Sequence, residues 1–338
     1  MARIVKLACR IRRNWRAAAL FAIAVSPALA AVQPAAPSWK PEKAIELIAQ
    51  NAPGGGGDRI LRIMAKVLQE QRLTDVPIIV VNKPGGGGSV AYTYLTQRSG
   101  SGHHIVSTGK MILTNNLMGV GPSYTEFTPV AKLFNEYIAI TVRPESSLKS
   151  GRDLVERLKK DPAALSVGIA GSPGNANHQG LAAALKEAGV DVRKVRTVVF
   201  QSGGAASTAM FGDHVDVVPL SVSFAASLLR GGQVRLLAIA APMRLPEALA
   251  EVPTWREQGY DAVVSNWRAM IGPRGMTEAQ TAYWEQTLQR MSESSEWKKE
   301  MAVNFWASDF LRSAEARQYM ERDNVQVRAF LTDLGLVK

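Results

Sequence analysis

Cysteine is almost absent from this chain of 338 residues, and histidine is scarce. The single cysteine, Cys9, lies in a basic N-terminal stretch, so a chain that loses this stretch has no thiol and forms no disulfide. The four histidines include no His-x-x-x-His pair. Because this spacing is typical of zinc sites, its absence favours a chain without a metal site. The mature chain also has no cysteine nucleophile.

A hydrophobic run long enough to cross a membrane is also lacking. The best candidate is "AAALFAIAVSPALA", residues 17–30, which Pro27 interrupts and which is shorter than the roughly 20 residues of a spanning helix. It follows a basic stretch without acidic residues and ends in Ala-Leu-Ala, which is typical of a secretory signal peptide. We therefore expect residues 1–30 to be a cleaved signal peptide and the mature protein to be periplasmic.

Acidic residues are fewer than basic ones, and the formal net charge is +11. Six of the basic residues lie within residues 1–30, so the mature chain carries only +5. The high isoelectric point is therefore largely a targeting feature. A chain with this modest charge gives little support to nucleic-acid binding, and we expect no nucleic-acid partner.

Several motifs of enzyme sites are missing. The glycine-rich segments are not followed by Gly-Lys-Ser/Thr, which excludes a P-loop, and their glycines are contiguous, which does not fit the dinucleotide fingerprint. No Gly-x-Ser-x-Gly nucleophile elbow is present. The sequence therefore predicts a protein that is not an enzyme and needs no cofactor, with a secreted hydrolase as a less favoured alternative.

Two glycine clusters stand between strand-like and helix-like segments. In "QNAPGGGGDRILRIMAKVLQ", residues 50–69, four glycines and Asp58 precede a stretch whose apolar residues recur with helical spacing. The segment "KPGGGGS", 83–89, follows the β-branched run 76–82 in the same way. With a third strand at 103–109, this order indicates a parallel α/β layer. Glycine permits positive φ and close backbone approach, so the loops are interpreted either as a ligand cradle or as simple turns that Asp58 caps.

The middle of the chain repeats this order. Ser150 and Asp153 form a capping signal for a helix, and strands are expected at 165–171, 195–200, 215–221 and 234–240. The part after about Thr277 is expected to be mostly helical. The pattern has four strand–loop–helix junctions with Gly or Ser at the turn, two in each half. In open α/β sheets such junctions lie at the edge where ligands bind, and their free N–H groups favour anions.

The chain resembles the solute receptors of tripartite tricarboxylate transporters, the Bug family of periplasmic binding proteins. The resemblance runs from about residue 43 to the C-terminus. It rests on these segments: "NAPGGGGD" (51–58), "VVNKPGGGGSVA" (80–91), "YTEFTPVAKL" (124–133), "GIAGSPGNANHQGL" (168–181), "FGDHVDVV" (211–218) and "GGQVRLLAIAAPMRLPEALAEVPTWREQGY" (231–260).

The resemblance implies an α/β fold of the two-domain periplasmic binding protein type (type II-like), in which two parallel-sheet α/β domains are joined by two crossover strands. We place these strands at 136–142 and near 256–268. Domain 1 would comprise residues 31–137 and 257–338, and domain 2 residues 138–256. The two domains would close on a ligand like a hinged trap.

The resemblance and the loop positions together give a set of candidate ligand-binding residues. They are Gly55, Gly56, Gly57, Asp58, Gly87, Ser89, Thr108, Lys110, Ser172, Gly174, Asn175, His178, Ser202 and Gly203. Two of these carry alternatives. Lys110 either reaches an acidic ligand or is a solvated lysine, and His178 either donates to a ligand oxygen or caps its helix turn. Gly57, Ala91, Lys110 and Ile112 depart from the family's usual residues, so the ligand's identity does not follow from the resemblance.

The function implied is that of an extracytoplasmic receptor that captures a small carboxylate, such as an organic acid, an aromatic acid or an amino acid. Its partners would be the membrane subunits of a tripartite tricarboxylate-type transporter, and it would act as a monomer. An alternative with the same binding site is a periplasmic sensor that delivers the solute to a signalling protein.

Overall fold

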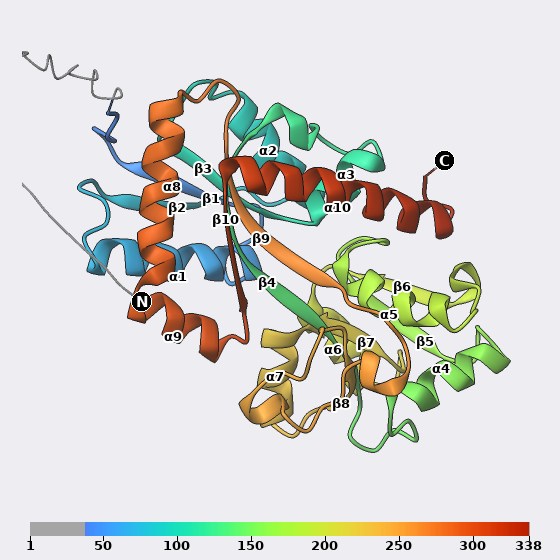
Figure 1. Ribbon diagram of the computed structural model, residues 1–338. Helices are drawn as coiled ribbons and strands as arrows, with labels where there is room; N and C mark the ends of the chain where they lie inside the picture. Colours follow the sequence, from blue (N-terminus) through green and yellow to red (C-terminus); the bar gives the residue numbers. More distant parts are fainter. Residues whose placement is uncertain (1–37, 338) are drawn as a thin grey trace, which may run out of the picture. The chain divides into compact units, whose positions relative to one another are not determined.

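The computed structural model describes residues 38–337, so the predicted signal peptide with Cys9, and residues 31–37 after it, lie outside the described residues. The described chain forms ten strands and ten α-helices (Figure 1). The strands are β1 (Ile45–Ala49), β2 (Ile78–Asn82), β3 (His104–Gly109), β4 (Thr128–Val142), β5 (Ser166–Ala170), β6 (Arg196–Phe200), β7 (Val218–Ser221), β8 (Arg235–Ile239), β9 (Ser265–Gly272) and β10 (Ala307–Arg312). The α-helices are α1 (Gly56–Glu70), α2 (Ser89–Thr96), α3 (Met111–Leu117), α4 (Gly151–Lys160), α5 (Ala176–Glu187), α6 (Gly203–Phe211), α7 (Val222–Arg230), α8 (Glu278–Glu293), α9 (Ser295–Val303) and α10 (Ser313–Asp333). Short 3-10 turns lie at Gly86–Gly88, Tyr124–Glu126, Val192–Lys194, Glu247–Leu249 and Arg256–Gln258.

One half of the molecule contains β1 to β3 together with β9 and β10, and it is called the first half below. It is built on a sheet with the strand order β10-β4-β9-β3-β1-β2. Strands β1, β2 and β3 are parallel, whereas β9, β4 and β10 pair antiparallel. The parallel strands are short apolar runs because helices cover both faces of the sheet. Ile45 and Leu47 face the core beneath α1, α8 and α9, whereas Ile48 faces the core beneath α2, α3 and α10.

The second half is assembled around the other end of β4. Strands β7 and β8 pair antiparallel with residues 138–142 of β4, and β5 pairs parallel with β6. Helix α4 begins with the predicted capping box, in which Ser150 and Asp153 exchange hydrogen bonds with each other's backbone N–H groups. Ile138 and Ile140 enter one core with α4 and α5, and Ala139 enters the core on the opposite face with α6 and α7.

The two halves are joined by β4 and by the segment that leads into β9. Residues 128–137 of β4 pair with β9, and residues 138–141 pair with β7 (Figure 1). The return segment donates the Val264 N–H to the Ala240 carbonyl in the second half, and β9 then pairs with β3 in the first half. The predicted α/β fold of the two-domain periplasmic binding protein type is confirmed, with antiparallel crossover strands added to the parallel ones. The domain boundaries at 137 and 257 stay a prediction.

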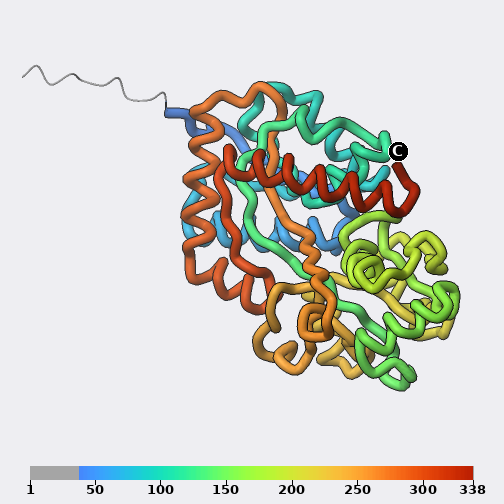
Figure 2. The backbone as a smooth tube through the Cα atoms, turned by 45° about the vertical axis from the view of Figure 1, so that its right-hand side comes forward, coloured from blue at the N-terminus to red at the C-terminus, as the bar shows by residue number. Residues whose placement is uncertain are grey.

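Helix α10 contacts both halves. It packs on β4 and α3, and its last turns place Phe330 and Leu334 against the core of the second half. An ion pair also links Asp333 at its end to Lys186 of α5. Figures 1 and 2 show this helix, in red, extending from the first half towards α5.

The C-terminal part is mostly helical, as expected, and one strand that the sequence did not predict, β10, interrupts it because "ASDFLR" pairs with β4 about 170 residues earlier. Besides the four expected strand-to-helix junctions, two more occur in the structure, at β3–α3 and β7–α7. Within residues 38–337 no helix is both long and apolar enough to cross a membrane.

Candidate functional site

The candidate residues lie where strands end and helices begin. Gly55 to Asp58 connect β1 with α1, Gly87 and Ser89 connect β2 with α2, and Lys110 immediately precedes α3. In the second half, Ser172 to His178 follow β5, and Ser202 and Gly203 follow β6. These junctions follow the carboxyl ends of parallel strands, the edge at which open α/β sheets bind ligands.

The first glycine loop is held mainly by its own neighbours. The Gly55 N–H donates to the Ala52 carbonyl at 3.0 Å, and the Gly57 N–H donates to Asn51 Oδ1 at 3.0 Å. A β-carbon on Gly57 would lie 2.4 Å from that Oδ1, so glycine is needed there for close approach. Gly56 differs, since a β-carbon would meet nothing within 4 Å and none of the described residues accepts from its N–H.

Asp58 stands in the first turn of α1, whereas the N-cap is Gly55, so the alternative in which Asp58 is the N-cap is wrong. Its carboxylate is 1% exposed and accepts hydrogen bonds from the Gly54 N–H, Arg62 Nε and Asn82 Nδ2. Burial by itself would raise the pKa of Asp58, but the hydrogen bonds from Arg62, Gly54 and Asn82 outweigh burial and lower it. Asp58 therefore holds the loop together as an anion.

The second glycine loop needs glycine for its backbone conformation. Gly85, Gly86, Gly87 and Gly88 all have positive φ, between 52° and 124°. The Gly87 carbonyl accepts a hydrogen bond from Asn115 Nδ2 at 2.7 Å, and a β-carbon on Gly87 would lie 2.8 Å from that nitrogen. This loop is thus bonded to α3, the helix that follows Lys110.

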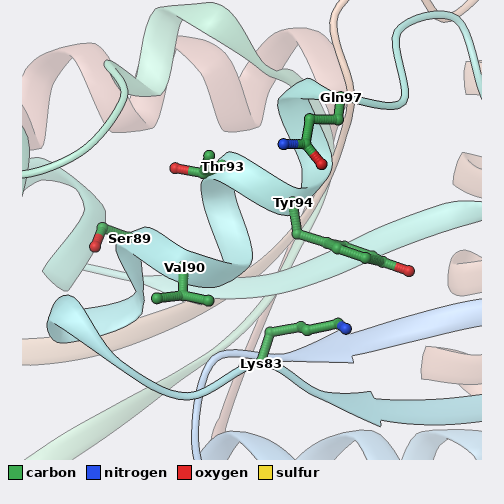
Figure 3. A pocket seen from close by; sticks show the side chains of 6 residues that line it. All are labelled: Lys83, Ser89, Val90, Thr93, Tyr94 and Gln97. Atoms are coloured by element: carbon green, nitrogen blue, oxygen red, sulfur yellow. The ribbon is translucent and has the colours of Figure 1, made fainter.

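Ser89 borders an open cavity of about 390 Å³ along the outer side of α2 (Figure 3). Its walls are Lys83, Ser89, Val90, Thr93, Tyr94 and Gln97. The Lys83 ammonium lies 4.3 Å from the centre of the Tyr94 ring. Ser89 is the one candidate residue that lines this cavity, which therefore does not unite the candidate set.

Thr108 belongs to a buried hydrogen-bonded chain. Its Oγ1 lies 2.8 Å from the Tyr92 hydroxyl, which donates to Gln50 Oε1 at 2.5 Å. Burial raises the pKa of Tyr92 well above its usual value, so the phenol stays neutral. Thr108 is itself 1% exposed, and its hydroxyl fixes the end of β3 against α2.

Lys110 is buried, at 6% exposure, which rules out the alternative of a solvated lysine. Its ammonium lies 2.9 Å from Asp323 Oδ1 on α10 and 3.4 Å from Gln179 Oε1 on α5. The other Asp323 oxygen accepts from Trp267 Nε1 at 2.6 Å. Lys110 thus brings the first half, α10 and the start of α5 together in one polar cluster.

The loop before α5 is closed by its own side chains. Asn175 caps the helix by accepting the His178 N–H and also donates to the Ala170 carbonyl. Nδ1 of His178 accepts the Gly174 N–H at 3.0 Å. This contact agrees with the alternative in which His178 caps its own turn. Burial lowers the pKa of His178 to about 4, so the ring is neutral at pH 7. The Ser172 hydroxyl is buried, and no acceptor or donor for it occurs in the described part of the chain.

Ser202 caps α6, since its Oγ accepts the Ala205 N–H at 3.1 Å, and the residue is exposed. A β-carbon on Gly203 would lie 3.2 Å from Leu220 Cδ2 and 3.3 Å from the Phe224 ring. Gly203 thus allows α6 to approach the start of α7 closely. The structure places both residues at a helix start. Among the described residues, neither forms a hydrogen bond with Lys110 or Asp58.

Three polar residues that the sequence did not single out lie beside the first glycine loop and the crossover strands. The Ser107 hydroxyl on β3 is buried and has no partner within residues 38–337, and a β-carbon on Gly57 would lie 3.5 Å from it. Arg268 on β9 donates from Nη2 to Glu136 Oε2 on β4 at 3.3 Å. In the sequence, only their positions within predicted elements could have pointed to them. Ser107 lies near the end of the third predicted strand, and Arg268 is the last residue of the second predicted crossover segment.

The chemistry on offer is hydrogen-bond donation to an anion. Helix starts, the Gly56 N–H, the Ser107 hydroxyl and the Arg268 guanidinium are donors, and carboxylates accept from such groups. No cluster of three or more His, Cys, Asp or Glu side chains suited to a metal ion occurs in residues 38–337. A pair of α/β halves joined by crossover strands, with donors at the strand ends, defines a solute-binding receptor.

Comparison with known proteins specifies the class further. The family model described as "Tripartite tricarboxylate transporter family receptor" matches residues 60–328, and the chain belongs to this family of solute-binding receptors. Protein BugT of Bordetella pertussis is 24% identical over 244 residues, which are 70% of this chain and 72% of BugT.

Two solved structures have the same fold. MatC of Rhodopseudomonas palustris, solved with bound malate, is 22% identical with a TM-score of 0.68 over 88% of this chain and 100% of that chain. A second R. palustris protein, solved with adipate, is 19% identical with a TM-score of 0.77 over 87% and 98% of the two chains.

Proposed function

We propose that this receptor captures a small carboxylate in the periplasm and presents it to the membrane subunits of a tripartite tricarboxylate-type transporter. Membership of the receptor family supports the transport role. Two proteins with this fold were solved with malate and with adipate, which are both small dicarboxylates. Their ligands suggest the chemical class for this chain, and the donors at its strand ends suit the same class.

The proposal rests on two hydrogen-bond donors without partners, which lie where the first turn of α1 meets β3. Here the Gly56 N–H is free of partners among the described residues, and a buried Ser107 hydroxyl without a partner there lies next to Gly57. A buried polar group that lacks a hydrogen bond costs free energy, so such groups are retained where a ligand uses them. The start of a helix adds a partial positive charge that favours an anion.

The proposed site extends from this turn to the other candidate loops. Lys110 would stand at one side, and the loop at Ser172 to His178 and the α6 start at Ser202 and Gly203 would approach from the second half. A receptor of this kind binds one solute per chain and acts as a monomer after its signal peptide is removed. The N-terminal segment that bears on export, residues 1–30, lies outside the described residues.

The test is a thermal-shift screen of the mature chain, from residue 31 onwards, against malate, adipate, citrate, glutamate and benzoate. Binding to the native state alone adds about 2.7 kcal/mol to the free energy of unfolding at about 100 times Kd, which corresponds to a rise in Tm of several degrees. We expect at least one acid to raise Tm in this way without being consumed. If no acid raises Tm while an ester or amide is hydrolysed, the protein is an enzyme and the proposal is wrong.

The transporter partnership needs a separate measurement. Uptake of the labelled acid by cells is compared with and without this receptor, in strains with intact and deleted membrane subunits. We expect uptake to require both. A receptor that binds the acid but is dispensable for uptake would serve a signalling partner instead.

A further inference from the structure

The guanidinium of Arg268 has more hydrogen-bond donors than its partners use. An arginine carries five N–H donors in one plane. Here the contact from Nη2 to Glu136 measures 3.3 Å, longer than the roughly 2.7–2.9 Å of a strong charge-assisted bond. Its Nε is buried and meets no acceptor among residues 38–337, although the side chain as a whole is 15% exposed. A charged group held this way has capacity for a further acceptor.

The position of Arg268 is fixed by the sheet. It stands opposite Gly109, the last residue of β3, in the antiparallel pairing with β9. A β-carbon on Gly109 would lie 2.9 Å from Arg268 Nη1, so the guanidinium rests against the strand end only because glycine is there. Side chains two residues apart on a strand share a face, so Ser107 lies on the same face of β3 as this guanidinium. The first turn of α1 and Arg268 therefore flank the same end of β3.

Glu136, the partner of Arg268, has a second support. Its other carboxylate oxygen accepts from the Ser223 hydroxyl, which belongs to the first turn of α7 in the second half. The side chain of Glu136 is only 4% exposed. If Arg268 turned to another anion, Ser223 and the partial positive charge at the start of α7 would still compensate Glu136. Arg268 can therefore exchange Glu136 for another anion, because Glu136 keeps Ser223 as a partner.

We propose that Arg268 binds a carboxylate group of the solute in place of Glu136 and so determines the receptor's specificity for carboxylates. The planar guanidinium matches the two oxygens of a carboxylate, which a backbone N–H alone cannot do. The loop of α1 and Ser107 supply neutral donors on the same face, and Arg268 supplies the charge. This inference rests on the proposed function, since it names the side chain that selects the ligand class at the same site.

The test is isothermal titration calorimetry with the acid from the panel above that binds the wild-type mature chain best. Arg268→Gln removes the charge and should raise Kd roughly tenfold to a hundredfold, the range for a lost hydrogen bond to a charged group. Glu136→Gln removes the competing anion but keeps an acceptor for Ser223, and it should lower Kd several-fold. Arg244→Gln is the matched control, because Arg244 also pairs with a glutamate, Glu257, at 2.7 Å but at an exposed site. Its Kd should equal that of the wild type.

Circular dichroism and Tm establish that each variant is folded. A folded Arg268→Gln with the wild-type Kd overturns the inference and leaves the proposed function intact. If no acid in the panel binds the wild type, the proposed function itself fails. Should Arg268→Gln not fold, Glu136→Gln decides the matter: unchanged or weaker binding in that variant contradicts the exchange of partners.

Discussion

The Lys110 ammonium lies 2.9 Å from Asp323 Oδ1, although 213 positions separate the two residues in the chain. Both side chains are at least nine-tenths buried, at 8% and 7% exposure. The carboxylate also accepts from Trp267, so three segments of the chain meet in this cluster. A buried ion pair is costly to break, because the remaining charge keeps its desolvation penalty and loses its partner.

Lys110→Met should therefore lower the free energy of unfolding by about 3–5 kcal/mol, the usual cost of removing one partner of a buried pair. Urea denaturation monitored by circular dichroism measures the change. Lys186→Met is the matched control, because Lys186 also pairs with an α10 aspartate, Asp333, but is 55% exposed. An exposed pair contributes at most about 1 kcal/mol. Equal losses in the two variants would show that burial does not govern the Lys110 pair.

Gly56 and Gly57 should respond differently to an added side chain. Gly56 has no positive φ, and a β-carbon there meets nothing within 4 Å, so Gly56→Val should leave Tm unchanged or slightly raised. Calorimetry should nevertheless show a loss of acid binding, since the valine occupies the space in front of the free N–H. Gly57→Ala should instead lower Tm, because its β-carbon would lie 2.4 Å from Asn51 Oδ1. Normal binding by a folded Gly56→Val would contradict the role of this loop in the site.

Gly87→Ala should destabilise the protein by about 1–3 kcal/mol, the cost of holding a side chain in an unfavourable backbone region. Gly87 has a φ of 62°, and its β-carbon would approach Asn115 Nδ2 to 2.8 Å. Gly119→Ala is a suitable control, because Gly119 has a φ of 73° but a β-carbon would meet nothing within 4 Å. Urea denaturation of both variants separates backbone strain from the clash with Asn115. A Gly87→Ala protein no less stable than Gly119→Ala would show that the contact with Asn115 adds nothing.

His178 should make stability depend on pH. Its pKa is lowered from 6.5 to about 4 by burial, so between these values the unfolded chain takes up a proton that the folded chain does not. The free energy of unfolding should be fully maintained above about pH 6.5 and should fall by up to about 3 kcal/mol as the pH drops to 4. Denaturation curves from pH 4 to 7 measure this slope.

The comparison for this prediction is His178→Gln, which cannot titrate in the range. Burial also lowers the pKa of His103 and His104, so the wild type should have the steeper slope and the variant should retain only a residual one. Identical slopes in the two proteins would mean that His178 is protonated as readily in the folded chain as in the unfolded one.

Most of the fold was accessible from the sequence because its elements are locally encoded. The capping box at Ser150, the apolar spacing of α1 and the β-branched strand β2 each follow from neighbouring residues. Strand β10 was missed because nothing in "ASDFLR" alternates between apolar and polar residues. It becomes a strand through pairing with β4, which is a long-range effect.

The candidate site was accessible in part. The loops were found through their glycines, but the reason for each glycine was not: positive φ at Gly54 and throughout 85–88, and close approach of Asn51 at Gly55 and Gly57. The burial of Lys110 depends on Asp323, whose partnership is not visible in local sequence. Arg268 and Glu136 are charged residues within strand segments, and only the sheet pairing shows that they lie side by side.

Strand β4 also dictates an order of events during synthesis. It lies between β9 and β10 in the first sheet, yet these two neighbours leave the ribosome more than 120 residues after it. Until then, β4 offers an unpaired edge that invites association with other chains, and the non-local pairing slows folding. The second half, whose strands β5 to β8 follow β4 directly, is complete first. The residues between β4 and β10 are therefore the part of synthesis during which a nascent chain is most exposed to aggregation, because β4 then lacks its sheet partners.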